Sequence, residues 1–445
     1  MPEALLAKMR TEGVIGVLMK GASALLSFAA AILLARWLGT EGFGFYSVCL
    51  GVATVIASVT QMGAGDLAVR LSASLQARGR TEEIIPLRNT LDRWIVAVGG
   101  LAVAGLMIGV WFLTGTPYQV WDLAPWALAG AVVIPVGLTV IRSGILKGVG
   151  EFTKGILPGA IVMPAFVALG ASFLMIFTHS WEFSSPVIAL GLYASASIAT
   201  WFVSDRLLTR RFRSHPPGPT PSRESLREYF REGVPFGVAD ASHVMHTYTA
   251  LLVIGATLGE TEAGIFKVAM QASILVVFFS SSINAMLSPH FTRLNIVNDR
   301  QTMAAAAGTS SRVLTIGGLG SFVALLLWGE PFIGLSFGIE FEPAFLPLLI
   351  LAAGHVVNVA TGPAADLLNM TGYGRITAGT KVTATIVNVP LTLLLSFHWG
   401  LAGAAAASAL TLAFWNLGLV WAVRSRLGVN CTAFYSRKRC AGVGT

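Results

Sequence analysis

The stretch Asp205–Glu232 reads DRLLTRRFRSHPPGPTPSRESLREYFRE and separates two long apolar parts of the chain. It contains seven arginines: Arg206, Arg210, Arg211, Arg213, Arg223, Arg227 and Arg231. The run His215–Pro219 interrupts any helix, because proline lacks an N–H and clashes with the preceding turn. Ser222 is a typical helix N-cap, and Leu226 and Phe230 share one helix face, so a short surface helix is predicted after it. We interpret 205–232 as a basic cytoplasmic linker between two membrane-embedded halves.

The composition on either side of this stretch is that of a membrane protein. The chain is 54% hydrophobic and 12% charged, whereas soluble domains carry about 25% charged residues. Apolar segments of about twenty residues, long enough to cross a bilayer as a helix, recur throughout. We therefore predict an all-α polytopic membrane protein with about twelve transmembrane helices, at 13–38, 43–69, 93–114, 124–147, 156–178, 186–204, 233–257, 264–289, 308–330, 344–367, 377–397 and 401–423.

These segments predict two six-helix halves. The first half comprises 1–204 and the second 233–423, joined by the linker 205–232 and followed by a cytoplasmic tail, 424–445. With the N-terminus in the cytoplasm, 24 of the 30 basic residues fall on the inner side, while the outer loops carry acids. This positive-inside pattern places both termini in the cytoplasm of a multi-pass protein of the cell inner (plasma) membrane.

The same distribution explains the net charge of +8 without a nucleic-acid partner. The three cysteines show no metal-ligand spacing, and the sequence contains no phosphate-binding loop and no catalytic motif. We expect no cofactor, no metal and no enzymatic activity.

Two short patterns recur in the halves. Leu38–Val48 resembles Leu258–Val268 at an offset of 220, and Gly148–Gly155 resembles Gly372–Gly379 at an offset of 224. Because six spans separate each pattern from its recurrence, the halves start on the same side of the membrane. Parallel repeats of this kind are found in secondary transporters, whose substrate sites lie between the halves.

Ionisable residues inside spans indicate a water-filled cavity, because burying a charge in lipid is costly. Lys20 and Asp240 occupy equivalent repeat positions (240 − 20 = 220) with opposite charges. Ser23 lies three residues after Lys20, and His243 lies three residues after Asp240, so each pair forms a polar stripe along one helix face. We predict that both stripes line the cleft between the halves. A purely structural Lys20–Asp240 ion pair is the alternative.

A second pair comes from the other offset. Arg142 and Asp366 are 224 residues apart, and Lys267 lies near the outer end of span eight. For Arg142 the alternative is a structural bond to the backbone or to Asp66. The candidate substrate-binding residues are thus Lys20, Ser23, Arg142, Asp240, His243, Lys267 and Asp366.

Three stretches carry a resemblance to a known family. Leu34–Ser47 resembles the first outer hairpin of polysaccharide-export flippases, and Gly259–Ala269 resembles the matching hairpin of their second half. Leu367–Gly372 is similar to the inner end of the tenth helix in that family. These flippases belong to the multidrug/oligosaccharidyl-lipid/polysaccharide exporter (MOP) superfamily. The resemblance implies a V-shaped, MATE-like fold with two pseudo-symmetric lobes, alternating access and a lipid-linked oligosaccharide as substrate.

The resemblance also implies roles for residues. Lys20 and Lys267 match cavity cations that contact the pyrophosphate of lipid-linked sugars in related flippases. Asp240 and the histidines beside it depart from that pattern, because they make the charge of the cavity less one-sided. Twelve spans rather than fourteen disfavour a peptidoglycan-precursor flippase.

We therefore predict a flippase that moves a polyprenyl-pyrophosphate-linked oligosaccharide from the cytoplasmic to the outer leaflet, for lipopolysaccharide or exopolysaccharide synthesis. Its expected partners are this substrate, membrane lipids, and the polysaccharide polymerase and glycosyltransferases of the pathway. The alternative is a multidrug or organic-cation antiporter of the same fold that uses Asp240 and Asp366. A membrane glycosyltransferase or polymerase would need a larger outer domain, and a structural scaffold would leave the intramembrane charges unexplained.

Overall fold

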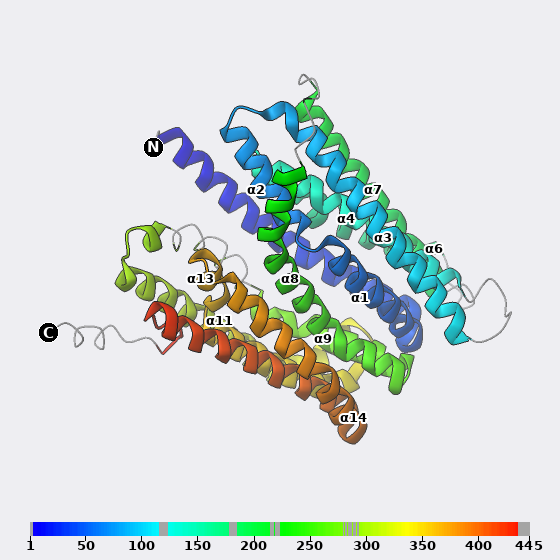
Figure 1. Ribbon diagram of the computed structural model, residues 1–445. Helices are drawn as coiled ribbons and strands as arrows, with labels where there is room; N and C mark the ends of the chain where they lie inside the picture. Colours follow the sequence, from blue (N-terminus) through cyan, green and yellow to red (C-terminus); the bar gives the residue numbers. More distant parts are fainter. Residues whose placement is uncertain are drawn as a thin grey trace. The chain divides into compact units, whose positions relative to one another are not determined.

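A computed structural model describes residues 3–114, 123–177, 185–213, 218, 223–278, 280, 283, 287, 291 and 293–434. These residues form helices and some of the turns between them, and none of them lies in a β-strand (Figure 1). The chain divides into two compact units, unit 1 from Met1 to Val244 and unit 2 from Met245 to Thr445. The division falls inside helix α8 (Arg223–Thr257).

Unit 1 is organised around one central helix. Its elements before α8 are α1 (Glu3–Gln61), α2 (Ala64–Ala77), η1 (Thr81–Glu83), α3 (Ile84–Thr114), α4 (Ala124–Gly148), α5 (Phe152–Leu157), the π-helix η3 (Pro158–Val162), α6 (Met163–Phe177) and α7 (Pro186–Phe212). Helix α4 packs against α1, α2, α3 and α7. Gly144 allows α2 and α4 to approach closely, since a Cβ there would lie 2.5 Å from the Gly65 carbonyl oxygen.

Unit 2 has a comparable organisation around α12. After α8 it contains α9 (Glu260–Ser273), η5 (Ile274–Val277), α11 (Arg300–Ser336), η6 (Ile339–Ala344), α12 (Phe345–Thr361), α13 (Ala364–Met370) and α14 (Gly374–Leu427). Helix α12 packs against α9, α11 and α14, and α13 packs against α14. The buried core includes Met303, Leu367, Leu368, Trp415, Leu419 and Val423.

Among the described residues, eight helical segments are long and apolar enough to cross a membrane. Two of them, Leu18–Ala77 with 60 residues and Gly374–Leu427 with 54, far exceed the roughly 20 residues that one crossing needs. Gly39 (φ 70°, ψ −176°) interrupts the first and Gly400 (φ 56°, ψ −135°) the second. Each long segment therefore supplies two arms separated by a turn. The arms correspond to the predicted spans 13–38 and 43–69 in the first segment and 377–397 and 401–423 in the second.

The first sequence repeat corresponds to a repeated backbone turn. Gly259 has φ 111° and ψ 178°, which matches the positive φ and extended ψ of Gly39. Only glycine adopts this combination readily, because a Cβ would clash with the backbone. The equivalence of the two hairpins at an offset of 220 therefore has a structural basis.

The second repeat is a turn after α4 and after α13. In the first copy the Glu151 N–H donates to the Leu146 carbonyl at 2.9 Å, and in the second the Tyr373 N–H donates to the Leu368 carbonyl at 2.8 Å. Both differences give the same offset, because 373 − 151 = 222 and 368 − 146 = 222. The structural offset is thus 222 rather than 224.

This two-residue difference corrects a predicted equivalence. Gly150 (φ 80°) and Gly372 (φ 90°) occupy the same turn position. The sequence pattern instead aligns Gly148 with Gly372. Asp366 therefore corresponds to Gly144 (366 − 222 = 144) and not to Arg142. The alignment failed because several small residues recur in both motifs, and only the positive φ identifies the equivalent one.

The segment between the helices that flank the basic stretch is shorter than the predicted linker 205–232. Helix α7 continues through Asp205 to Phe212, and α8 begins at Arg223. The helix predicted from Ser222 is present, but it continues without a break to Thr257 instead of ending at Glu232. Asp205 is therefore part of a packed helix, which decides its role below.

Candidate functional site

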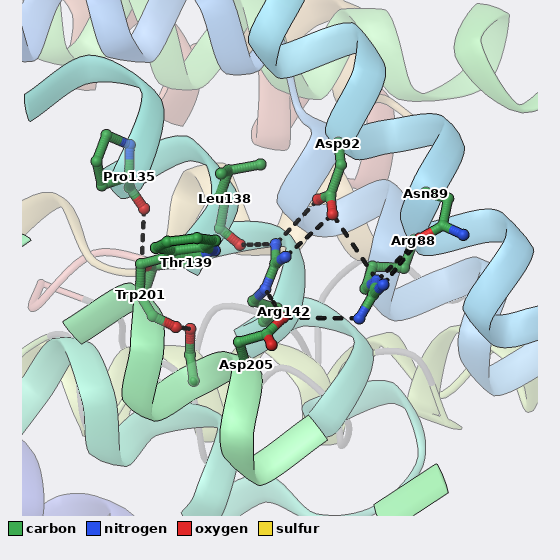
Figure 2. A network of polar contacts seen from close by, with 10 residues as sticks. Arg88, Asn89, Asp92, Pro135, Leu138, Thr139, Arg142, Trp201 and Asp205 are labelled. Carbon is green, nitrogen blue, oxygen red and sulfur yellow. Dashed lines mark hydrogen bonds and ion pairs between the residues drawn. The ribbon is translucent and has the colours of Figure 1, made fainter. Parts of the chain in front are cut away.

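An arginine–aspartate cluster joins α3, α4 and α7 of unit 1 (Figure 2). The Arg142 Nη1 and Nη2 atoms donate to the two Asp92 carboxylate oxygens at 2.9 and 3.0 Å, and Nε donates to Asp205 Oδ1 at 2.9 Å. Nη1 also donates to the Leu138 carbonyl at 3.0 Å. Arg88 lies 3.8 Å from Asp92 and 3.6 Å from Asp205. Two arginines and two aspartates thus balance one another.

The geometry gives Arg142 a structural role. The residue is 3% exposed, and its guanidinium carbon lies 5.7 Å from the centroid of the Trp201 ring. A buried guanidinium is tolerated only where carboxylates and hydrogen bonds offset its desolvation. Its carboxylate partners are Asp92 and Asp205, and the bond to Leu138 is the backbone contact considered as an alternative from sequence. Among the described residues, no bond joins Arg142 to Asp66, the other alternative. Substrate binding by Arg142 stays a prediction, and it would require these ion pairs to open.

A second group of charges in unit 1 involves Lys20. Lys20 is half-buried on α1, Lys147 lies in the last turn of α4, and Asp66 lies in the first turn of α2. Asp66 attracts the Lys147 ammonium electrostatically, and Lys20 repels it. The structure therefore brings two lysines from different helices close together with one carboxylate. Sequence reasoning missed Lys147, because no spacing rule relates residues that are 127 positions apart.

The remaining candidates of the first polar stripes lie on α1 and α8. Ser23 is half-buried one turn after Lys20, while Asp240 and His243 are exposed on α8. Both α8 residues make interactions within the described part of the chain. Whether these side chains line a shared cleft, and whether Lys20 pairs with Asp240, stay predictions.

Two candidates lie in unit 2. The Lys267 Nζ atom on α9 is 5.3 Å from the centroid of the Tyr248 ring, a cation–π geometry. Asp366 is half-buried on α13 and interacts electrostatically with Lys381 of α14. The Lys381 Nζ atom in turn lies 5.4 Å from the centroid of the Trp415 ring.

A buried hydrogen-bonded ring occupies unit 2 beside these residues. His246 Nε2 lies 2.8 Å from Thr411 Oγ1, which lies 3.1 Å from Asn388 Oδ1. Asn388 Nδ2 donates to the His246 carbonyl oxygen at 3.3 Å and closes the ring. The three residues are 5% exposed or less. Sequence reasoning missed this ring because His246 lies outside the Asp240–His243 stripe on α8.

The segment after α14 is also bound into unit 2. We call residues 428–434 the C-terminal strap. The Ser311 hydroxyl donates to the Cys431 carbonyl at 2.7 Å, and the Ala433 N–H donates to the Ala360 carbonyl at 2.9 Å. Cys431 is fully buried. The first part of the predicted cytoplasmic tail is therefore packed against α11 and α12, and residues 435–445 lie outside the described residues.

Solved membrane transporters share this fold. An inward-facing multidrug resistance MATE family transporter of the MOP superfamily matches with a TM-score of 0.68 and 14% identity, covering 94% of this chain and 98% of that chain. The lipid II flippase MurJ in an inward closed conformation matches with a TM-score of 0.71 and 14% identity, covering 92% and 87%. The protein is thus an all-α polytopic membrane protein with a MATE-like fold, as predicted.

Sequence comparison defines the family more narrowly. The family model described as "Polysaccharide biosynthesis protein" matches residues 12–295, and the chain belongs to this family. A relative from Haloferax volcanii, "Probable low-salt glycan biosynthesis flippase Agl15", is 24% identical over 196 residues, which are 43% of this chain and 41% of the relative. The chain therefore matches about two fifths of that relative's length. The predicted resemblance to polysaccharide flippases of the MOP superfamily is confirmed.

Proposed function

We propose that this protein flips a polyprenyl-pyrophosphate-linked oligosaccharide from the cytoplasmic to the outer leaflet of the plasma membrane by alternating access. Membership of the polysaccharide biosynthesis family supports this class of function. The relative named as a glycan biosynthesis flippase and the fold shared with a lipid II flippase point in the same direction. The glycan would then enter lipopolysaccharide or exopolysaccharide synthesis, with glycosyltransferases acting before the flippase and a polymerase after it.

One observation on this chain carries the proposal. Lys20 and Lys147 come from different helices, and their ammonium groups lie close enough to repel each other, with Asp66 as a nearby carboxylate. Two neighbouring cations favour a multivalent anion, because its charge relieves their repulsion. A pyrophosphate offers several oxygens that accept hydrogen bonds from ammonium groups.

The mechanism follows from this charge balance. Without substrate, Asp66 partly neutralises the pair. When the pyrophosphate binds, its oxygens take over that role, and the binding energy differs between conformations that hold the lysines together and those that do not. A ligand shifts a conformational equilibrium only through such differential affinity.

The proposal is tested by substitution at the two lysines. Lys20→Ala and Lys147→Ala should each abolish surface polysaccharide, measured as exported glycan per cell, while the protein still reaches the membrane. Lys20→Arg and Lys147→Arg should retain part of the export because the charge remains. Lys154→Ala is the matched control, since this lysine is 52% exposed and contacts only Glu151 among the ion pairs found. Normal export by a stably inserted Lys20→Ala, Lys147→Ala double variant would exclude this pair as a headgroup site.

A multidrug or organic-cation antiporter is the second candidate, favoured by the match to a MATE multidrug transporter over 98% of its chain. Such a protein binds cations through acidic cavity residues, here Asp240 and Asp366. In that case the Asp240→Asn, Asp366→Asn double variant would lose drug resistance in a susceptible host, and glycan export would be unchanged by Lys20→Ala.

A further inference from the structure

The hydrogen-bonded ring in unit 2 contains one group that can gain a charge. The Thr411 hydroxyl lies 2.8 Å from the Ala407 carbonyl, four residues earlier on α14, and 2.8 Å from His246 Nε2. A hydroxyl has one proton to donate, and here it is directed at an oxygen, either the Ala407 carbonyl or Asn388 Oδ1 at 3.1 Å. We therefore assign Nε2 of His246 as the donor to Thr411. The second ring nitrogen, Nδ1, is then the atom that accepts a proton.

The ring connects His246 to both arms of α14. Asn388 precedes the turn at Gly400 and Thr411 follows it, so the two residues lie on different arms. Thr392 Oγ1 donates to Asn388 Oδ1 at 3.2 Å and fixes the amide from the first arm. A change in the charge of His246 therefore acts directly on side chains from two helical arms. Because these side chains are buried and hydrogen-bonded, they cannot reorient without breaking a bond.

A second imidazole lies nearby. His355 on α12 has a buried Nδ1 atom without a hydrogen-bond partner, and a positive charge on His355 opposes one on His246. A buried ring nitrogen without a partner is costly. Two coupled groups of this kind take up protons as a pair, and repulsion allows one proton where two separate groups would take two.

Nearby charges also limit how many protons His246 and His355 can bind. Lys381 and His246 both contact the Trp415 ring, at 5.4 Å from Nζ and 5.2 Å between ring centroids. Lys381 disfavours a second positive charge beside it, and Asp366 interacts with Lys381 and offsets part of this effect. Further titratable groups on adjoining elements include Asp240, His243 and Tyr248 on α8 and Lys267 on α9.

The donor set favours a proton over a metal ion. The ring atoms of His246, Asn388 and Thr411 are neutral and bonded to one another, and none of the three carries a carboxylate. Hard metal cations prefer carboxylate oxygens. Across the described ranges, no group of three or more His, Cys, Asp or Glu residues could hold a metal ion.

We propose that His246 and His355 form a proton-binding site in unit 2 that takes up a single proton on one of its two imidazoles, and that its occupancy alters the packing of α8 against both arms of α14. This inference goes beyond the proposed glycan transport, and its test requires no glycan. A transporter with such a site can use a proton gradient to bias its conformational equilibrium.

The test uses Trp415 as a reporter. The full chain, labelled with 5-fluorotryptophan and purified in detergent, is titrated by ¹⁹F NMR between about pH 3 and 8.5, a range that extends well below the ordinary histidine pKa of about 6.5. The Trp415 resonance is assigned with Trp415→Phe. It should show one titration step, and His246→Gln should abolish that step, because glutamine can donate to Thr411 but cannot take up a proton. His398→Gln, at an exposed histidine of α14, should leave the step unchanged.

A second readout follows the partner ring. In ¹³C-histidine-labelled protein, His355 should take up its proton at a higher pH in His246→Gln than in the unchanged chain, because the opposing charge is gone. A Trp415 resonance that does not respond to pH in the unchanged chain would overturn the proposal, as would independent protonation of the two rings. A shift on adding Na⁺ at constant pH would assign the site to a metal cation instead.

Discussion

Arg142 of α4 and Asp92 of α3 form a bidentate ion pair, with nitrogen–oxygen distances of 2.9 and 3.0 Å. The same guanidinium binds Asp205 on α7 at 2.9 Å. One nearly buried side chain therefore fixes three helices of unit 1. Such a cluster is costly to break, because removing one partner leaves a buried charge without compensation.

Asp92→Asn should therefore destabilise unit 1. We expect the free energy of unfolding to fall by about 3 kcal/mol, the scale found when one partner of a buried ion pair is removed. Chemical or thermal unfolding in detergent measures this loss. The control Lys154→Ala breaks an ion pair whose lysine is 52% exposed, so its effect should stay below about 1 kcal/mol. A loss for Asp92→Asn no larger than the control's would show that the cluster contributes little.

The C-terminal strap predicts a difference between two glycines with positive φ. A Cβ at Gly362 (φ 76°) would lie 2.1 Å from Ser311 Oγ and 2.2 Å from the Cys431 carbonyl oxygen, whereas one at Gly372 (φ 90°) would meet nothing within 4 Å. Gly372→Ala should cost only the backbone strain, about 1–2 kcal/mol. Gly362→Ala should cost clearly more, because the strap must also move. Equal losses in unfolding experiments would argue against a docked strap.

The thiol of Cys431 should resist alkylation. Burial raises the pKa of this thiol to about 12 from its ordinary value of 9.0. The folded state therefore favours the neutral thiol, and the stability it contributes is complete below pH 9 and is lost as the pH rises towards 12. In a Cys440→Ser background, iodoacetamide at pH 8 should modify Cys431 more slowly than in the unfolded chain, by on the order of a hundredfold. Mass spectrometry of peptides measures this, and rapid modification would place the strap in solvent.

The charge pattern predicts the membrane topology. A reporter that is active only outside the cytoplasm should remain silent when fused after Thr445, because both termini are predicted to be cytoplasmic. The same reporter fused after Glu182, in a predicted outer loop, should be active. Reversed activities would overturn the predicted orientation and with it the direction of flipping.

The sequence by itself determined the class of protein and much of its helical layout. A 54% hydrophobic chain with apolar segments of membrane length has few alternatives to an α-helical bundle, because lipid cannot satisfy backbone hydrogen bonds. Local glycine patterns also located the turn shared by Gly39 and Gly259, since positive φ with extended ψ is nearly restricted to glycine. These features depend on neighbouring residues, which a sequence displays directly.

Tertiary structure alone decided which charges meet. Arg142 and Asp205 are 63 residues apart and Lys20 and Lys147 are 127 apart, and His246 meets Thr411 across 165 residues. The repeat offset even suggested the wrong equivalent of Arg142, since the two turns align at 222 and not at 224. Partners of this kind depend on how helices pack and rotate, and a shift of one residue turns a helical side chain by about 100°. Such a rotation decides whether a charged side chain forms a buried ion pair or faces a cavity, and a local sequence pattern does not indicate which.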